Sequence, residues 1–319
     1  MLRRLSESGA DREAPREFVD HLAARVRSAA ARALLVDAEA ASTLAQLEAA
    51  GIACVLLKGV ARRAAAGRWP CVDARTTTDV DLLVRAADAT RAWGAMQAAG
   101  YRPVSYANPT YHLPALIGPG RVAVELHTSL TAALPADEAW RRMAGDALEI
   151  DWQGHRVRIP AATELLWHGV IHAQPHELKA WRLRYLLDAA APLAGDDPIN
   201  WKTVAARLDA GEVPDAGIAR RWLGAAADLA GVQIPASVTA GAAPFDIPTA
   251  LGWRLAVLAR TGDAGLGARL LEEGTRIELG MPPAEVVPGT GMFKQTRRWL
   301  GGRAARGIYR LWRATRSRP

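Results

Sequence analysis

The sequence predicts an α/β (α+β) protein, in which a mixed β-sheet with helices is followed by an α-helical domain. Over residues 51–160, short apolar runs alternate with Ala-rich helical segments, as expected for a sheet with helices packed on it. From residue 161, helical segments follow one another between Pro and Gly residues. A chain of 319 residues is long enough for two domains, each with its own core.

The N-terminal half divides at its glycines and prolines. Residues 15–49 contain no Gly or Pro after Pro15 and predict one or two helices. The apolar run 52–57 follows Gly51 and predicts a buried strand. The remaining expected elements are a helix at 60–66, a polar loop at 68–78, a strand at 80–84, a helix at 87–99, and strands at 101–105, 111–117 and 122–127.

The second half opens with a predicted hairpin and continues as helices. Two alternating runs flank Gln153-Gly154, which is a turn sequence. The strands are expected at 147–152 and 156–159, and helices at 161–173, 178–194, 200–210, 215–230, 247–260 and 263–274. We therefore divide the chain into N-terminal helices that pack on the sheet domain (1–50), the sheet domain itself (51–160), a helical domain (161–278), and a linker with a basic C-terminal tail (279–319).

Composition predicts a cytoplasmic protein. No apolar run reaches the ~20 residues that a membrane span needs, and the N-terminal basic residues are not followed by the apolar core of a secretory signal. The two cysteines, Cys54 and Cys71, provide neither a disulfide framework nor a zinc-binding spacing. A reducing compartment is the simplest interpretation of this cysteine usage.

The basic charge lies at the C-terminus. Residues 286–319 contain no acid and nine Lys or Arg residues; removing these nine charges from the net charge of +7 leaves −2 for residues 1–285. Ile308, Leu311 and Trp312 would share one helical face within this tail. We expect residues 286–319 to bind an anionic membrane surface, nucleic acid or a peptide partner, which would place the protein at the membrane periphery. The alternative is a disordered or partner-docked tail.

Three carboxylates lie on two strand-like runs. Asp79 and Asp81 are two residues apart in Asp-Val-Asp-Leu-Leu-Val, and Glu125 lies in Val-Ala-Val-Glu-Leu-His. Side chains alternate along a strand, so both aspartates would point to the same face. If the two strands are neighbours, the three acids converge and need a cation between them. Carboxylate oxygens suit Mg²⁺, which also binds substrate phosphates, and this predicts a phosphoryl or nucleotidyl transfer site.

The order of these motifs resembles a known family. Leu56-Leu57-Lys58-Gly59, Arg75, Asp79 to Val84, Gly100-Tyr101 and Glu125-Leu126-His127 follow one another as in the bacterial uncharacterised nucleotidyltransferase family of the DNA polymerase beta-like superfamily. The likeness is tight over residues 50–130 and continues loosely to about 230.

The resemblance implies a metal-dependent nucleotidyltransferase with the nucleotidyltransferase fold. It would move a nucleoside monophosphate from a nucleoside triphosphate, expected to be ATP, to an acceptor hydroxyl on a small molecule, peptide or protein, with release of pyrophosphate. Asp79, Asp81 and Glu125 would be catalytic and would hold Mg²⁺ or Mn²⁺. The nucleotide would be bound by Lys58, Gly59, Arg75 and His127, with His127 as phosphate contact, acceptor contact or partner of a metal ligand.

The chain departs from well-studied superfamily members at Lys58-Gly59-Val60, where those have Gly-Ser or Gly-Gly. Gly59 still allows close backbone approach, and Lys58 could supply a point charge to a phosphate. The departure keeps open a non-catalytic nucleotide-binding or regulatory protein. A third alternative is a nucleic-acid or membrane-surface binding protein that acts through its tail. His168 and His172 would share a helical face, but the sequence has no zincin motif beside them.

Overall fold

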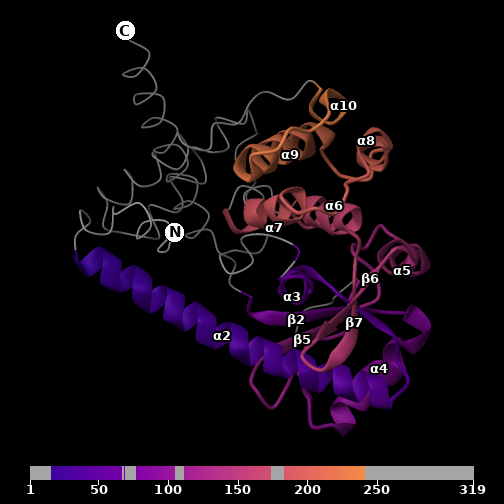
Figure 1. Cartoon of the computed structure of the whole chain (residues 1–319). Coiled ribbons are helices and arrows are strands. Elements are labelled where there is room, and N and C mark those ends of the chain that lie inside the picture. The colour runs from indigo at the N-terminus through magenta and orange to yellow at the C-terminus, as the bar shows by residue number, and fades with distance from the viewer. Residues whose placement is uncertain (1–15, 67, 69–76, 105–110, 174–182, 241–319) are drawn as a thin grey trace, which may run out of the picture.

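The computed structural model describes residues 16–66, 68, 77–104, 111–173 and 183–240 (Figure 1). The predicted helices at 247–260 and 263–274, the linker and the basic tail lie outside these residues. Arg75 and Cys71 also lie outside them. The predictions made for these segments stay predictions.

The centre of the fold is a five-stranded mixed sheet in the order β1-β2-β5-β4-β3. The strands are β1 (Cys54–Leu56), β2 (Asp79–Val84), β3 (Arg102–Pro103), β4 (Leu116–Ile117) and β5 (Ala123–His127). Strands β2 and β5 pair in parallel, whereas the other neighbours are antiparallel. The expected mixed sheet is therefore present.

Strand β2 is buried on both faces because its side chains enter two separate hydrophobic clusters. Val80, Leu82 and Val84 join the cluster that contains residues of helices α2 (Arg16–Ala49) and α4 (Ala89–Ala98). Leu83 points to the opposite face and joins the cluster of helices α6 (Ala162–Ala173) and α7 (Leu183–Leu193). The sheet thus lies between α2 and α4 on one side and the helical half on the other (Figure 1).

One or two helices were predicted within residues 15–49, and Arg16–Ala49 form the single 34-residue helix α2. Its buried residues Val36, Ala40, Leu44 and Leu47 recur every three or four positions, which places them on one helical face. That face packs on the sheet, so tertiary contacts stabilise the C-terminal half of α2.

Two predicted strands are shorter in the structure. The strand expected at 101–105 is β3, Arg102–Pro103, and the strand expected at 111–117 is regular only at Leu116–Ile117. Pro114 explains the shortening at 111–117, because it has no N–H group to donate to a ladder. Pro103 is a paired residue of β3, and Val104 N after it still donates to Ala115 O at 2.7 Å. The chain on the N-terminal side of Pro114 still pairs with β5, through a bridge between His112 and His127 and a hydrogen bond from Leu113 N to Leu126 O.

The predicted hairpin is present as β6 (Leu148–Trp152) and β7 (His155–Ile159). Gln153 and Gly154 both have positive φ at its turn, as a two-residue hairpin loop requires. Helices α6, α7, α8 (Trp201–Asp209) and α9 (Ala216–Ala230) lie within the four helical ranges predicted up to residue 230. Among the residues that the structure describes, two α-helices were missed, α5 (Ala136–Gly145) and the four-residue α10 (Ala236–Thr239). The acids Asp137 and Glu138 after Pro135 are a start signal for α5 that the sequence did contain.

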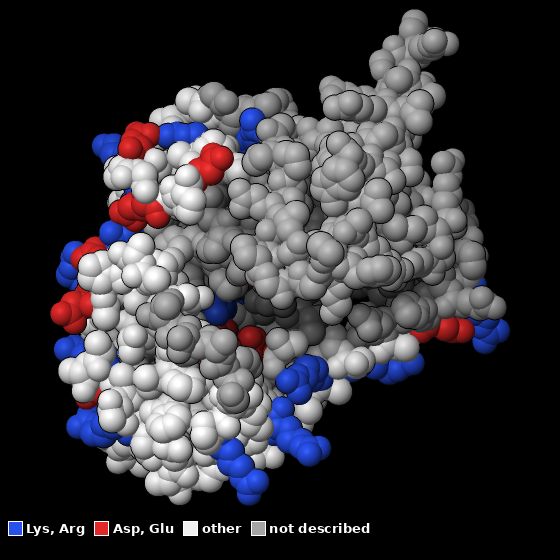
Figure 2. All heavy atoms as spheres, turned by 180° about the vertical axis from the view of Figure 1, so that it is seen from behind, with Lys and Arg blue, Asp and Glu red and all other residues white. Residues whose placement is uncertain are grey.

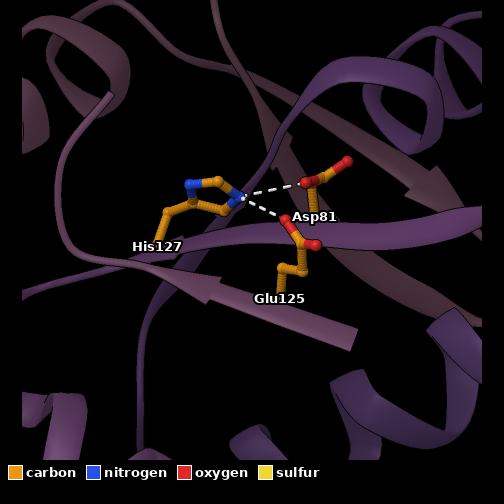
Figure 3. Close-up of side chains that lie close together, drawn as sticks. All are labelled: Asp81, Glu125 and His127. Carbon is orange, nitrogen blue, oxygen red and sulfur yellow. Dashed lines mark hydrogen bonds and ion pairs between the residues drawn. The ribbon is translucent and has the colours of Figure 1, made fainter. Parts of the chain in front are cut away.

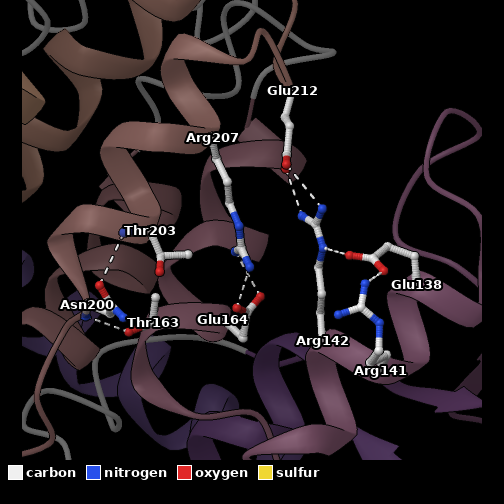
Figure 4. Close-up of polar contacts among 9 residues, drawn as sticks. All are labelled: Glu138, Arg141, Arg142, Thr163, Glu164, Asn200, Thr203, Arg207 and Glu212. Atoms are coloured by element: carbon white, nitrogen blue, oxygen red, sulfur yellow. Dashed lines mark hydrogen bonds and ion pairs between the residues drawn. The ribbon is translucent and has the colours of Figure 1, made fainter.

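Ion pairs and a cap hold the helical half together (Figure 4). Arg207 of α8 pairs with Glu164 of α6 through both carboxylate oxygens, and Arg142 of α5 does the same with Glu212. The Asn200 side chain accepts a hydrogen bond from Thr203 N at the start of α8, which satisfies one of the free N–H groups of that helix end. The Arg142–Glu212 pair crosses the boundary predicted near residue 160, and that division into domains stays a prediction.

Helix α3 (Lys58–Ala64) is clamped to elements on both sides. The buried Arg62 donates to the Asp188 carbonyl of α7 from Nε at 3.0 Å and Nη2 at 2.6 Å. Arg63 pairs with Asp37 of α2, with Nε 2.6 Å from Oδ1. The start of α3, which carries Lys58, is therefore held between the two halves. None of the helices within the described ranges has the length and apolarity needed to cross a membrane.

Candidate functional site

The parallel pairing of β2 with β5 brings the predicted site residues together. In the register, Asp81 is opposite Glu125 and Leu83 is opposite His127. Because side chains alternate, Asp81, Glu125 and His127 all lie on the face that looks toward the helical half. One candidate ligand atom from each of these three residues lies within 4.8 Å of the others (Figure 3).

Lys58 completes this acidic cluster. Its Nζ donates a hydrogen bond to Asp81 Oδ1 at 2.6 Å and lies 3.9 Å from Glu125 Oε2. The Lys58 side chain is 15% exposed, whereas that of Asp81 is 1% exposed. A buried carboxylate needs a charged partner or hydrogen bonds, and Lys58 supplies both to Asp81.

His127 is the second partner of both acids. Its Nε2 lies 3.0 Å from Asp81 Oδ1 and 3.5 Å from Glu125 Oε2 (Figure 3). A carboxylate only accepts hydrogen bonds, so Nε2 is the donor in this arrangement. The buried Nδ1 has no hydrogen-bond partner in the part of the chain that the structure describes.

The charges in this cluster stabilise one another. Burial alone would raise the pKa of Asp81, but Lys58 and His127 outweigh it and hold that pKa well below its usual range. Burial would lower the pKa of Lys58, whereas Asp81, Glu125 and Asp79 raise it above its ordinary value. Asp81 is therefore ionised and Lys58 is positively charged at neutral pH.

The backbone of Lys58 is left-handed, with φ of 48°. This conformation is uncommon for a residue other than Gly and costs about 1–2 kcal/mol. Two hydrogen bonds hold it, from Leu57 N to Asp81 O at 2.9 Å and from Arg62 Nη1 to Lys58 O at 2.9 Å. The result is a fixed starting point from which the Lys58 side chain reaches the acids. Gly59 is buried as the second residue of the seven-residue α3, and its nucleotide-binding role stays a prediction.

Asp79 lies apart from the close group. It is on the same face of β2, two residues before Asp81, and its Oδ1 accepts a hydrogen bond from Thr78 Oγ1 at 3.3 Å. Within the described ranges, the residues whose ligand atoms converge are Asp81, Glu125 and His127. The metal-binding role predicted for Asp79 stays a prediction.

Several neighbours of the site were not predicted as part of it. The rings of Tyr111 and His112 lie against His127, with centroids 5.9 Å and 5.2 Å from its own. Arg62 was also missed, although its bond to Lys58 O positions the site. No local sequence pattern predicts these contacts. Tyr111 and His112 lie at the site because His112 pairs with His127 of β5, and Arg62 does so because it belongs to α3.

The two carboxylates of this group suit Mg²⁺ or Mn²⁺, and substrate phosphates or water can complete the coordination of these ions. For His127 to bind a metal through Nε2, the ring proton would move to Nδ1, which is the nitrogen without a partner. Lys58 Nζ lies against the same two acids, so a bound metal would compete with this ammonium group for their oxygens.

His168 of α6 gives a testable pH dependence. Burial, together with the nearby Lys58, His172 and His127, lowers its pKa well below the ordinary value. As pH falls below about 6.5, the unfolded chain takes up a proton at this residue while the folded protein does not. The stability from His168 is thus complete above pH 6.5 and decreases by up to about 1.4 kcal/mol per pH unit below it.

We expect His168→Leu to flatten the decrease in unfolding free energy between pH 6.5 and 5, measured by urea denaturation. His155→Gln is the control, because His155 pairs with Glu48 near the surface. An unchanged pH slope in His168→Leu would contradict the assignment.

Comparison with known proteins identifies the family to which most of the chain is similar. The sequence profile of the family described as "uncharacterised nucleotidyltransferase" matches residues 1–218, which is more than half of the chain. A search of curated proteins found no match. Among solved structures, the antibiotic-resistance factor ANT(2'')-Ia is similar at a TM-score of 0.36 and 15% identity, over 48% of this chain and 82% of the other.

Proposed function

The chain belongs to the uncharacterised nucleotidyltransferase family, and on this premise we propose that it is a metal-dependent transferase that moves a nucleoside monophosphate from a nucleoside triphosphate to an acceptor hydroxyl. The observation that carries the metal dependence is the register of β2 and β5, which places Asp81 beside Glu125 with His127 on the same face. The two convergent carboxylates suit a divalent cation. The lysine beside them suits the triphosphate of a substrate that the cation also binds.

In the proposed site, Asp81, Glu125 and His127 would hold Mg²⁺ or Mn²⁺, with Asp79 as the further predicted ligand. A bound ion would neutralise phosphate charge and lower the pKa of the attacking hydroxyl. The side chain of Glu125 is 21% exposed, so it is more accessible to a substrate than Asp81. Glu125 accepts the proton of the acceptor hydroxyl in this scheme.

The proposed reaction forms one bond and breaks one. The acceptor oxygen attacks the α-phosphorus, the bond from that phosphorus to the β-phosphate bridging oxygen breaks, and pyrophosphate leaves. Lys58, with Arg75 as predicted, would bind the phosphates of the nucleotide. The acceptor would lie between the sheet and the helical half, where His172 of α6 is 5.5 Å from Tyr185 of α7 between ring centroids. A small molecule such as a sugar or antibiotic, or a hydroxyl of a peptide or protein, fits this proposal.

The direct test is mass spectrometry of candidate acceptors incubated with the full chain, Mn²⁺ and each of the four common nucleoside triphosphates. The expected result is that the acceptor gains the mass of one nucleotidyl group (a nucleoside monophosphate less one water), in higher yield with ATP, with an equal amount of pyrophosphate released. A gain that persists in excess chelator, or the release of orthophosphate in place of pyrophosphate, would contradict the proposed reaction.

For the tail, we propose salt-sensitive binding to anionic surfaces. The full chain should sediment with acidic liposomes at low salt and dissociate as salt increases, since each Arg near the surface contributes about 1 kcal/mol. A chain that lacks residues 286–319 should stay in solution. Equal sedimentation of both chains would contradict this role for the tail.

A further inference from the structure

We propose that Lys58 is a resident counter-ion of the acidic site, which neutralises Asp81 and Glu125 in the metal-free protein and moves to the triphosphate when a divalent cation binds. The inference rests on the proposed function and adds an exchange of cations at the two carboxylates. This exchange makes metal binding and nucleotide binding depend on each other.

The first support is the position of the ammonium group. Lys58 Nζ is 2.6 Å from Asp81 Oδ1 and 3.9 Å from Glu125 Oε2, and these two carboxylates belong to the candidate metal group. Asp81 Oδ1 also lies within hydrogen-bond distance of His127 Nε2. The ammonium group therefore contacts the carboxylate oxygens that a metal would use.

The second support is that an ammonium group and a divalent cation bound to the same two carboxylates would repel each other strongly. Asp81 is 1% exposed, so water screens that repulsion poorly. In the metal-free protein Lys58 is needed, because a buried carboxylate without a partner is strongly unfavourable. With metal bound, the same lysine becomes unfavourable in its present place.

The third support is that the side chain can move while its backbone stays fixed. The bonds from Arg62 Nη1 to Lys58 O and from Leu57 N to Asp81 O hold the main chain. The lysine stem has four flexible carbons, and its side chain is partly exposed. In the space-filling view, acidic and basic atoms are both visible in a hollow between the two halves of the molecule (Figure 2).

A phosphate gives the displaced ammonium a new partner. The metal alone must displace Lys58 without compensation, whereas the metal with a nucleoside triphosphate supplies both a charge for the acids and an anion for the lysine. Each ligand should therefore raise the affinity for the other by the same factor, as thermodynamic linkage requires.

The experiment is a titration of the full chain with Mn²⁺, followed by electron paramagnetic resonance of the free ion, without and with an α,β-methylene analogue of ATP. The variants are Lys58→Met, which keeps the stem length and removes the charge, and the control Lys202→Met on the exposed side of α8. Without nucleotide, we expect Lys58→Met to bind Mn²⁺ about tenfold or more tightly than the unmodified chain. The nucleotide should increase Mn²⁺ affinity in the unmodified chain and in Lys202→Met, and much less in Lys58→Met.

Mn²⁺ binding to Lys58→Met that is no tighter than to the unmodified chain would overturn the exchange. If Lys58→Met does not fold, as judged by circular dichroism, Lys58→Gln replaces it, because its amide can still donate to Asp81. If the unmodified chain binds Mn²⁺ with the nucleotide and Asp81→Asn does not, the proposed function stands even when the exchange fails. Absence of Mn²⁺ binding in every variant, with and without nucleotide, would overturn the proposed metal site and the exchange together.

Discussion

Asp81→Asn should reduce nucleotidyl transfer by about a thousandfold or more, since the site loses a buried charge that stabilises the transition state. The same change should remove the increase in melting temperature caused by Mn²⁺ with a non-hydrolysable ATP analogue, because only a ligand bound to the folded protein stabilises it. It should also destabilise the metal-free protein by about 3 kcal/mol, since Lys58 and His127 lose their common partner. Activity assays and differential scanning fluorimetry measure these effects.

The matched control is Asp151→Asn, which makes the same change at an exposed strand position in the β6–β7 hairpin. It should leave both transfer and melting temperature nearly unchanged. A metal-dependent stabilisation of normal size in Asp81→Asn would show that the metal lies elsewhere.

Glu125→Gln should have the second-largest effect on transfer and a smaller effect on nucleotide binding. If Glu125 accepts the proton of the attacking hydroxyl, kcat should fall by about a hundredfold or more. The KM for the nucleotide should change less than kcat, because Asp81 and His127 would still hold the cation, whereas the lost proton acceptor acts in the transition state. The folded protein should tolerate the change, since Glu125 lies 3.9 Å from Lys58 and is partly exposed.

Steady-state kinetics measures kcat, and a nucleotide titration measures the affinity for the nucleotide separately. Glu149→Gln is the control, since Glu149 is also a strand carboxylate with arginine partners and lies on the exposed hairpin. Near-normal kcat with weakened nucleotide affinity in Glu125→Gln would reverse the role given to this residue.

Much of the secondary structure could be predicted because its signals are local. The apolar runs that became β1, β2 and β5 are bounded by polar or turn residues, and Gln153-Gly154 marks the hairpin of β6 and β7. The helices α6 to α9 follow Pro and Gly punctuation. The prediction was wrong where Pro114 removed a ladder donor, and where α5 followed the strand β5.

By itself, the sequence determined which residue types face one side of β2 and β5, because alternation along a strand is a property of the backbone. It also determined the order of motifs that places the chain in its family. Only the tertiary structure decided that β2 and β5 are parallel neighbours with Asp81 opposite Glu125. It also decided that Lys58, 23 residues before Asp81, is the cation between them, and that Arg62 reaches α7 across 126 residues. These pairings depend on how separate elements pack, and the spacing of residues along the chain does not encode that packing directly.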